Sequence, residues 1–396
     1  MVTQPAENIN PKSQHKLFGL DHLRALAILL VLGFHYQLLY PHPRWTECFL
    51  QLGWTGVDLF FVLSGFLISS QLFAQIKKGR DISLKTFYFK RFFRILPIYF
   101  FIVAVYFLFP FFREKEALAP LWKFITFTLN FGLDIKHFGT FSHACSLCVE
   151  EHFYLLFPLI LIFLQSRKLF AKSYWIFLAL FIIGIGLRMY LWSVYYPSNS
   201  EMNDALSYWI KHIYYPTYNR LDGLLVGVAI AALREFLPSV WSRISKLGNQ
   251  FILLSMLLLI IIYFYFSDMG TYETSVWGFP LVAIAYGFLV CGAVSTSCFL
   301  YNWNSRITTF IAVLSYGIYL SHKGVIHMVQ YGLIRMGIEE YSNLMLLTCI
   351  TACVLAAWLL NLTIEKPFMK MRDRVIGQKS KPAVRSIKAE LETISS

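Results

Sequence analysis

The feature that most constrains this chain is a series of apolar segments, each long enough to cross a lipid bilayer. About ten of them follow one another along the sequence, on the criterion of about 20 mostly apolar residues per crossing. Continuous apolar runs of this length indicate helices, because a helix satisfies its own backbone hydrogen bonds in lipid. The segments are Leu20–Tyr40, Val57–Ile76, Arg94–Phe112, Ser142–Leu164, Tyr174–Trp192, Asn219–Leu233, Phe251–Phe266, Val276–Ser297, Phe310–Gln330 and Leu344–Glu365. The sequence therefore predicts an all-α, polytopic transmembrane helical bundle.

Composition supports a membrane protein and excludes two other classes. Of the residues, 57% are hydrophobic and only 14% are charged, and the mean hydropathy is +0.56, which is not typical of a soluble domain. The net charge of +13 would suit nucleic-acid binding, but the basic residues lie in short loops and in the tail. We therefore expect no nucleic-acid partner. Seven cysteines lie mostly inside apolar segments, so we expect no disulfide framework.

The distribution of lysine and arginine predicts the orientation. They concentrate after the second, fourth, sixth and last segments, in residues 77–94, 167–172, 234–246 and 366–388. By the positive-inside rule, both termini are then cytoplasmic. No cleavage site follows the polar N-terminus, so we expect the first segment to be retained in a multi-pass protein of the cell's inner membrane.

Three regions are expected along the chain. Residues 1–17 form a polar cytoplasmic N-terminus, and residues 18–368 form the transmembrane domain. Residues 369–396 form a basic cytoplasmic tail, and its positive charge predicts contact with anionic membrane lipid.

Two ionisable residues share one face of the first segment. Arg24 and His35 are eleven positions apart, so at about 100° per residue they point the same way, about 16 Å apart along the axis. Ionisable groups inside a membrane are costly and often mark a pathway or a reaction site. We interpret the pair as functional, with a fixed cation near one surface and an imidazole near the middle of the bilayer.

The fourth segment carries two adjacent carboxylates, Glu150 and Glu151, followed by His152. A carboxylate near an imidazole fixes its tautomer and raises its basicity, as a general base requires. A structural ion pair or a protonated glutamate is the alternative. Asp58, in the outer part of the second segment, is a further polar candidate.

Other polar residues leave alternatives open. Arg220 and Asp222, near the outer surface, either bind a polar substrate or pair with each other. His322 is a second histidine near mid-depth of the membrane. Cys145 and Cys148 form a CxxC pair, for which helix packing is favoured over metal binding or redox chemistry, so no metal site is expected.

At the predicted cytoplasmic side, Arg91 and Arg94 are i, i+3 neighbours that can bind one phosphate together, although ordinary positive-inside charge explains them equally. A donor with a phosphorylated head and a long arm, such as an acyl-coenzyme A, would place its head there. Its thioester would then reach toward His35, and a hydroxyl acceptor would approach from outside.

Taken together, these motifs resemble the acyltransferase-3 family of integral-membrane O-acyltransferases, which includes bacterial O-antigen acetylases. The resemblance covers roughly residues 18–368, and its motifs occur in the family's order. They are Arg24 with His35, Gly56 to Asp58 with Ser64 to Phe66, Arg91 with Arg94, Ser146 to Tyr154, Arg220 to Gly223, Ser315 and Tyr316 with Tyr319 and His322, and Ile364 to Phe368. The chain departs from the usual pattern with Cys145 for Trp, Cys148 for Ser and His152 for Gln.

The resemblance implies transfer of an acyl group, most often acetyl, from cytoplasmic acyl-coenzyme A to a hydroxyl of an envelope or lipid-linked glycan such as lipopolysaccharide O-antigen. It implies that His35 is the general base or an acyl relay, with Glu150 or Glu151 orienting it. The donor would be held by Arg24, Arg91 and Arg94. The acceptor side would be shaped by Asp58, Arg220, Asp222 and His322.

Many members of the family carry an additional extracytoplasmic hydrolase-like domain. This sequence ends in a short tail, so we expect it to act alone or with a separate extracytoplasmic partner. Two other classes remain: a proton-coupled transporter that uses the same buried His and Glu, and a scaffold whose ionic groups only lock helices together. The sugar, the acyl length and the oligomeric state stay open.

Overall fold

The computed structural model describes residues 17–47, 51–170, 173–195 and 202–376. All regular structure in these ranges is helical, which confirms the predicted fold class. The predicted polar N-terminus and basic tail fall largely on residues 1–16 and 377–396, which lie outside the described residues.

The α-helices differ widely in length, and short 3₁₀ and π segments connect several of them. They are α1 (Phe18–Leu39), α3 (Gly56–Lys77), α4 (Leu84–Leu108), α5 (Leu121–Ile125), α6 (Ala144–Ser166), α7 (Ser173–Tyr195), α8 (Met202–Trp209), α9 (Asp222–Phe236), α10 (Pro238–Ile244), α11 (Gly248–Tyr265), α12 (Phe279–Ala293), α13 (Phe299–Asn302), α14 (Arg306–Arg335) and α15 (Asn343–Leu360).

Within the described residues, eight helical segments are long and apolar enough to cross a membrane. The expected number was about ten, and the two expected segments that are not among them correspond to α9 and α14. Helix α9 has only 15 residues. Helix α14 has 30 residues but carries buried polar side chains, including His322 and Lys323, which lower its hydropathy.

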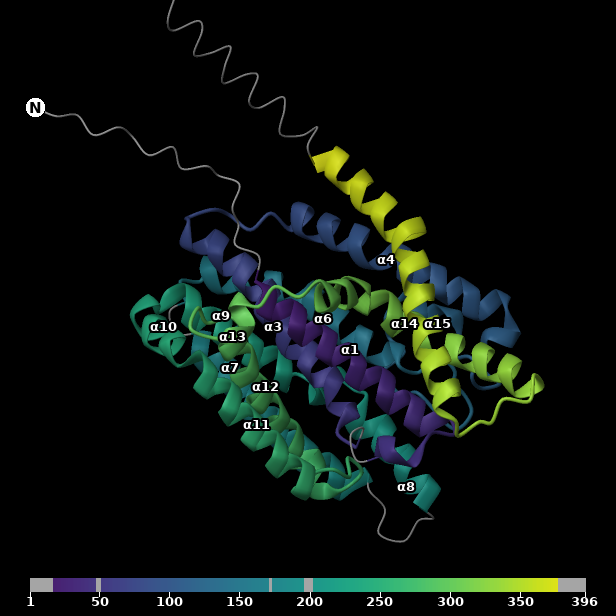
Figure 1. Ribbon diagram of the computed structural model, residues 1–396. Helices are drawn as coiled ribbons and strands as arrows, with labels where there is room; N and C mark the ends of the chain where they lie inside the picture. Colours follow the sequence, from purple (N-terminus) through teal and green to yellow (C-terminus); the bar gives the residue numbers. More distant parts are fainter. Residues whose placement is uncertain (1–16, 48–50, 171–172, 196–201, 377–396) are drawn as a thin grey trace, which may run out of the picture.

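Helix α1 crosses the middle of the molecule in Figure 1, between α7 and α9–α12 on one side and α4, α14 and α15 on the other. Two hydrophobic clusters correspond to these sides. One joins Leu23 of α1 to α3, α9 and α12. The other joins Ile28 of α1 to α4, α6 and α14. Because α1 contributes to both clusters, its polar side chains lie inside the bundle.

Helices α3 and α9 make the most extensive contact between two helices. A Cβ atom added at Gly65 would lie 2.2 Å from the carbonyl oxygen of Leu224, and one at Gly227 would lie 2.3 Å from that of Val62. Glycine is therefore required at both positions for the two backbones to touch, as in other membrane helix pairs.

Candidate active site

His35 lies in a cluster of three histidines contributed by three parts of the chain. Its Nδ1 atom is 3.0 Å from Nε2 of His322 on α14. His143, the residue before α6, completes the cluster. The ring centroids of His143 lie 4.8 Å from His322 and 5.8 Å from His35. Helices α1, α6 and α14 thus bring together imidazoles that are far apart in the sequence.

The hydrogen bonds of His322 determine which nitrogen of His35 is basic. Nδ1 of His322 lies 2.8 Å from the carbonyl oxygen of Tyr319 and 3.1 Å from that of Ile318. A carbonyl only accepts, so Nδ1 of His322 carries a proton and, in the neutral ring, Nε2 is an acceptor. His35 then donates from Nδ1, and its Nε2 keeps a free lone pair. This is the tautomer a general base needs.

His35 lines a cavity of about 120 Å³, here called the histidine cavity. Its other polar lining includes Glu114, His143, Arg220 and Lys323. Lys323 follows His322 on α14 and is buried, with its Nζ atom donating to Ser142 Oγ at 3.4 Å. The site therefore combines imidazoles with fixed charges of both signs.

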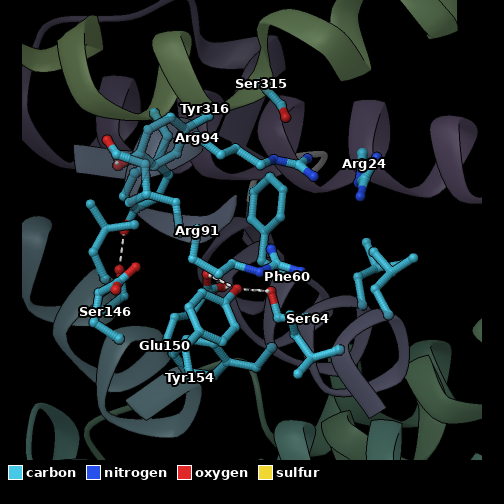
Figure 2. Close-up of a pocket in the computed structure, with 18 of the residues that line it drawn as sticks. Arg24, Phe60, Ser64, Arg91, Arg94, Ser146, Glu150, Tyr154, Ser315 and Tyr316 are labelled. Atoms are coloured by element: carbon cyan, nitrogen blue, oxygen red, sulfur yellow. Dashed lines mark hydrogen bonds between the residues drawn. The ribbon is translucent and has the colours of Figure 1, made fainter. Parts of the chain in front are cut away.

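The two carboxylates of α6 line a different cavity of about 280 Å³, here called the arginine cavity (Figure 2). Glu150 accepts hydrogen bonds from Ser64 at 3.1 Å and from Tyr154 at 2.9 Å. Among the described residues, neither Glu150 nor Glu151 is hydrogen-bonded to His35. The expected carboxylate–histidine pairing is replaced by the pair of histidines.

Helix geometry explains this difference. His143, which precedes α6, is the residue near His35, and Glu150 is seven positions further along the helix. At 1.5 Å per residue the carboxylate lies about 10 Å away along the axis.

The three arginines expected to hold the donor, Arg24, Arg91 and Arg94, all line the arginine cavity. Figure 2 shows their side chains converging on the same space from different helices. Arg24 lies 4.0 Å from Asp21, and the Arg91 guanidinium lies 5.2 Å from the ring centroid of Tyr154. The predicted donor set is thus brought together in one place.

The two cavities share part of their lining. Ser146 and Tyr319, together with Val57 and Phe61, line both. The hydroxyls of Ser146 and Tyr319 are hydrogen-bonded to each other. Helix α1 passes both spaces, with Arg24 lining one and His35 the other. His35 therefore faces the interior of the bundle, in a cavity that shares lining residues with the one that holds the arginines.

The acceptor-side residues form two buried ion pairs, and Arg220 and Asp222 do not pair with each other. Arg220 pairs with Asp58 at 3.0 Å, and Asp222 pairs with Arg188 at 2.7 Å. Arg220 also lies 4.2 Å above the ring centroid of Phe279. Neither Asp58 nor Asp222 lines the histidine cavity, whereas Arg220 and His322's neighbour Lys323 do.

Sequence reasoning did not assign a role to His143, Lys323 or Glu114. Lys323 had a visible signal, because it is a charged residue inside an expected membrane segment and adjacent to His322. His143 and Glu114 lie at the ends of apolar segments, where polar residues are ordinary. Only the folded chain places them beside His35.

The CxxC cysteines are packed within the bundle. Cys145 and Cys148 are free thiols buried in the cluster around α4, α6 and α14. The Sγ atom of Cys148 lies 3.4 Å from the carbonyl oxygen of Ala144. In the part of the chain that the structure describes, no group of three or more His, Cys, Asp or Glu is arranged to hold a metal ion.

Fold and site together define a multi-pass helical membrane protein with an internal histidine site adjoining an arginine-lined cavity. The chain belongs to the acyltransferase-3 family, whose model, described as "Acyltransferase domain", matches residues 17–362. This confirms the family indicated by the motifs.

Two relatives illustrate the similarity. The chain is 29% identical over 394 residues to a Staphylococcus aureus protein named "Putative O-acetyltransferase SAR0937", covering 93% of this chain and 60% of the relative. It is 29% identical over 336 residues to peptidoglycan O-acetyltransferase OatA of Listeria monocytogenes, covering 78% of this chain and 49% of the relative. The chain thus spans about half to three fifths of the length of these relatives. The comparison with solved structures gives no match.

Proposed function

We propose that this chain is a membrane-embedded O-acyltransferase that moves an acyl group, most often acetyl, from cytoplasmic acyl-coenzyme A to a hydroxyl of an envelope glycan. The single observation that carries the proposal is the pair of adjoining cavities. One holds three arginines, and the other holds a histidine whose Nε2 atom is free to take a proton. The shared boundary at Ser146 and Tyr319 is where the two substrates would meet.

The arginine cavity suits a phosphorylated donor. Arg24, Arg91 and Arg94 line it from two helices, and guanidinium groups bind phosphate oxygens through geometrically matched hydrogen bonds. All three lie on the side that the loop charges predict to be cytoplasmic, where acyl-coenzyme A is found. The thioester would extend from this cavity toward Tyr319.

In the proposed reaction, His35 Nε2 removes the proton from the acceptor hydroxyl as its oxygen attacks the thioester carbonyl. The bond from carbonyl carbon to sulfur breaks, and the thiolate of coenzyme A leaves. The imidazolium of His35 returns the proton to this thiolate, so the histidine is regenerated. The alternative, in which His35 carries the acyl group itself, uses the same nitrogen.

The relatives' names guide the choice of acceptor. The named Listeria relative is a peptidoglycan O-acetyltransferase, which favours a cell-wall glycan of that type over lipopolysaccharide O-antigen for this chain. The reaction would take place in the cytoplasmic membrane, surrounded by lipid. A separate extracytoplasmic partner that receives the acyl group is compatible with this scheme.

The proposal is tested with purified protein in lipid nanodiscs and radiolabelled acetyl-coenzyme A. We expect His35→Gln to lower acetyl transfer by about 10²- to 10⁴-fold, the range typical of a lost general base. Donor affinity, measured by isothermal titration, should be retained because His35 lies outside the arginine cavity.

His327→Gln is the matched control, since His327 is also on α14 but does not line either cavity. It should leave transfer unchanged. If wild-type protein does not bind acetyl-coenzyme A, the proton-coupled transporter is favoured. If His35→Gln lowers protein abundance instead of activity, the scaffold class is favoured.

A further inference from the structure

Two side chains of the histidine cavity share a pattern: one polar atom is hydrogen-bonded and a second is buried without a partner. Arg220 donates through Nη2 to Asp58 at 3.1 Å, and its Nη1 atom is unpaired. His143 contacts the carbonyl oxygen of Leu320 through Nε2 at 3.4 Å, and its Nδ1 atom is unpaired. Both residues are deeply buried, with 4% and 5% exposure.

Glu114 repeats the pattern with the opposite charge. Its Oε1 atom accepts a hydrogen bond from the backbone N–H of Phe141 at 2.9 Å, and Oε2 is buried without a partner. The Tyr106 hydroxyl lies close to this carboxylate, and no hydrogen bond of standard geometry joins the two groups. The carboxylate is thus held in place by the backbone while one oxygen remains open.

Buried polar groups are nearly always hydrogen-bonded, because an unpaired one loses its hydration without compensation. Here three such groups, on Arg220, His143 and Glu114, line the same small cavity as His35. Each is fixed by its bonded atom and cannot turn toward another partner without losing that contact. This arrangement is pre-organised for a ligand that enters the cavity.

We infer that Glu114, His143 and Arg220 form a binding subsite for neighbouring hydroxyl groups of an uncharged sugar, an inference that rests on the proposed function and names its acceptor-binding residues. A guanidinium only donates hydrogen bonds and a carboxylate only accepts them, whereas a hydroxyl does both. Two neighbouring hydroxyls therefore satisfy both fixed groups.

A cationic ligand fits the subsite less well. An ammonium group would face Lys115, Arg220 and Lys323, which line the same cavity. The subsite therefore discriminates between a neutral sugar and its cationic amino counterpart.

The sizes of the cavities indicate how much of the acceptor enters. The histidine cavity, about 120 Å³, is smaller than the cavity of about 150 Å³ that admits benzene, so it takes one edge of a sugar ring. It shares Phe34 and Leu38 with an outer hollow of about 800 Å³. That hollow is lined by polar side chains that suit the rest of a glycan: Gln37, His42, Arg44, Glu47 and Gln51.

The test is direct binding of tetra-N-acetylchitotetraose, a neutral oligosaccharide, to the full chain in nanodiscs, measured by isothermal titration without acetyl-coenzyme A. We expect wild type to bind it, and Glu114→Gln to weaken binding at least tenfold because the charged acceptor is lost. His143→Gln should weaken binding as much, because the glutamine amide takes the position of Nε2, which contacts Leu320, and leaves none at Nδ1. His143→Asn should retain more affinity, because the shorter asparagine amide lies near the position of Nδ1. The deacetylated, cationic tetramer should not bind.

Glu116→Gln is the control on the same loop, since Glu116 is exposed, and it should bind as wild type does. Absence of binding to wild type, equal binding by Glu114→Gln, or equal binding of the cationic tetramer would each overturn the inference. Acetyl transfer is measured separately. Binding without transfer would contradict the proposed function alone, and transfer without any effect of Glu114 or His143 would contradict the subsite alone.

Discussion

The hydrogen bond between His35 and His322 takes the place of the carboxylate contact that a catalytic histidine commonly has. His322 is fixed by the carbonyl oxygens of Ile318 and Tyr319, so its Nε2 atom is directed at Nδ1 of His35. A neutral partner orients the base without placing a negative charge beside it. Lys323, the next residue on α14, is buried beside His322.

This role predicts different effects for two substitutions of His322. His322→Gln keeps a hydrogen-bond acceptor near the position of Nε2 and should lower acetyl transfer by about tenfold, whereas His322→Ala should lower it by about 10²-fold or more. Both should retain the acetyl-coenzyme A affinity of wild type. Equal rates for the two variants, at equal protein abundance, would show that His322 does not position His35.

The buried ion pair of Arg188 with Asp222 predicts that replacing one partner lowers the stability of the protein. Arg188 has 0% exposure, so Asp222→Asn leaves a buried cation without its counter-ion and should destabilise the protein by about 3–5 kcal/mol. Thermal unfolding in detergent measures this. Replacing both residues, as Arg188→Met with Asp222→Leu, should recover most of the loss.

The exposed pair Arg372–Asp373 is the control, because Asp373→Asn should cost no more than about 1 kcal/mol. If the Asp222→Asn variant is as stable as wild type but binds the acceptor more weakly, Asp222 is part of the acceptor site and not a structural ion-pair partner.

At the scale of the helices, the crossing of α3 and α9 leaves no room for a larger side chain at Gly65. Gly65→Ala would place a Cβ atom 2.2 Å from a backbone carbonyl oxygen of α9, which cannot move aside without separating the helices. We expect a loss of at least about 1–3 kcal/mol in unfolding free energy. Thermal unfolding and the yield of folded protein report it.

Gly186→Ala on α7 is the matched control, since a Cβ atom there meets nothing within 4 Å. Its stability should equal or slightly exceed that of wild type. Equal stability of both variants would mean that the two backbones do not touch at Gly65.

Helix α14 illustrates how one element serves both cavities. Ser315 and Tyr316 line the arginine cavity, Tyr319 lies at the boundary, and Lys323 lines the histidine cavity. The i, i+3/i+4 spacing of these residues places them on one face of the helix. The sequence motif on α14 therefore extends along both cavities.

At the scale of the whole molecule, the order of the two cavities predicts that donor and acceptor enter from opposite sides. Proteoliposomes with tetra-N-acetylchitotetraose trapped inside should accumulate O-acetylated sugar when acetyl-coenzyme A is added only outside. The molecules whose arginine cavity faces outward perform this transfer. Mass spectrometry of the vesicle contents measures the product, and His35→Gln vesicles provide the background.

Product formed only when both substrates are on the same side of the vesicle would contradict a path through the bundle. It would require both substrates to enter from one face.

Much of the site was accessible from the sequence because local rules govern it. Apolar length predicted the eight helical segments that are long enough to span, and the spacing of Arg24 and His35 predicted their common face. Arg24, Arg91 and Arg94, grouped from the sequence as one set, line one cavity. Each of these follows from helix periodicity or from the cost of charge in lipid.

The amino-acid sequence by itself determined the helical membrane architecture, the family and the chemical types present at the site, because bilayer thickness and helix period act on each segment separately. Only the tertiary structure decided the partners. His35 meets His322 instead of Glu150, and Asp58 and Asp222 are used in ion pairs. The physical reason is that pairing between helices depends on their relative depth and rotation, which packing contacts such as that of Gly65 with Leu224 set and no single segment encodes.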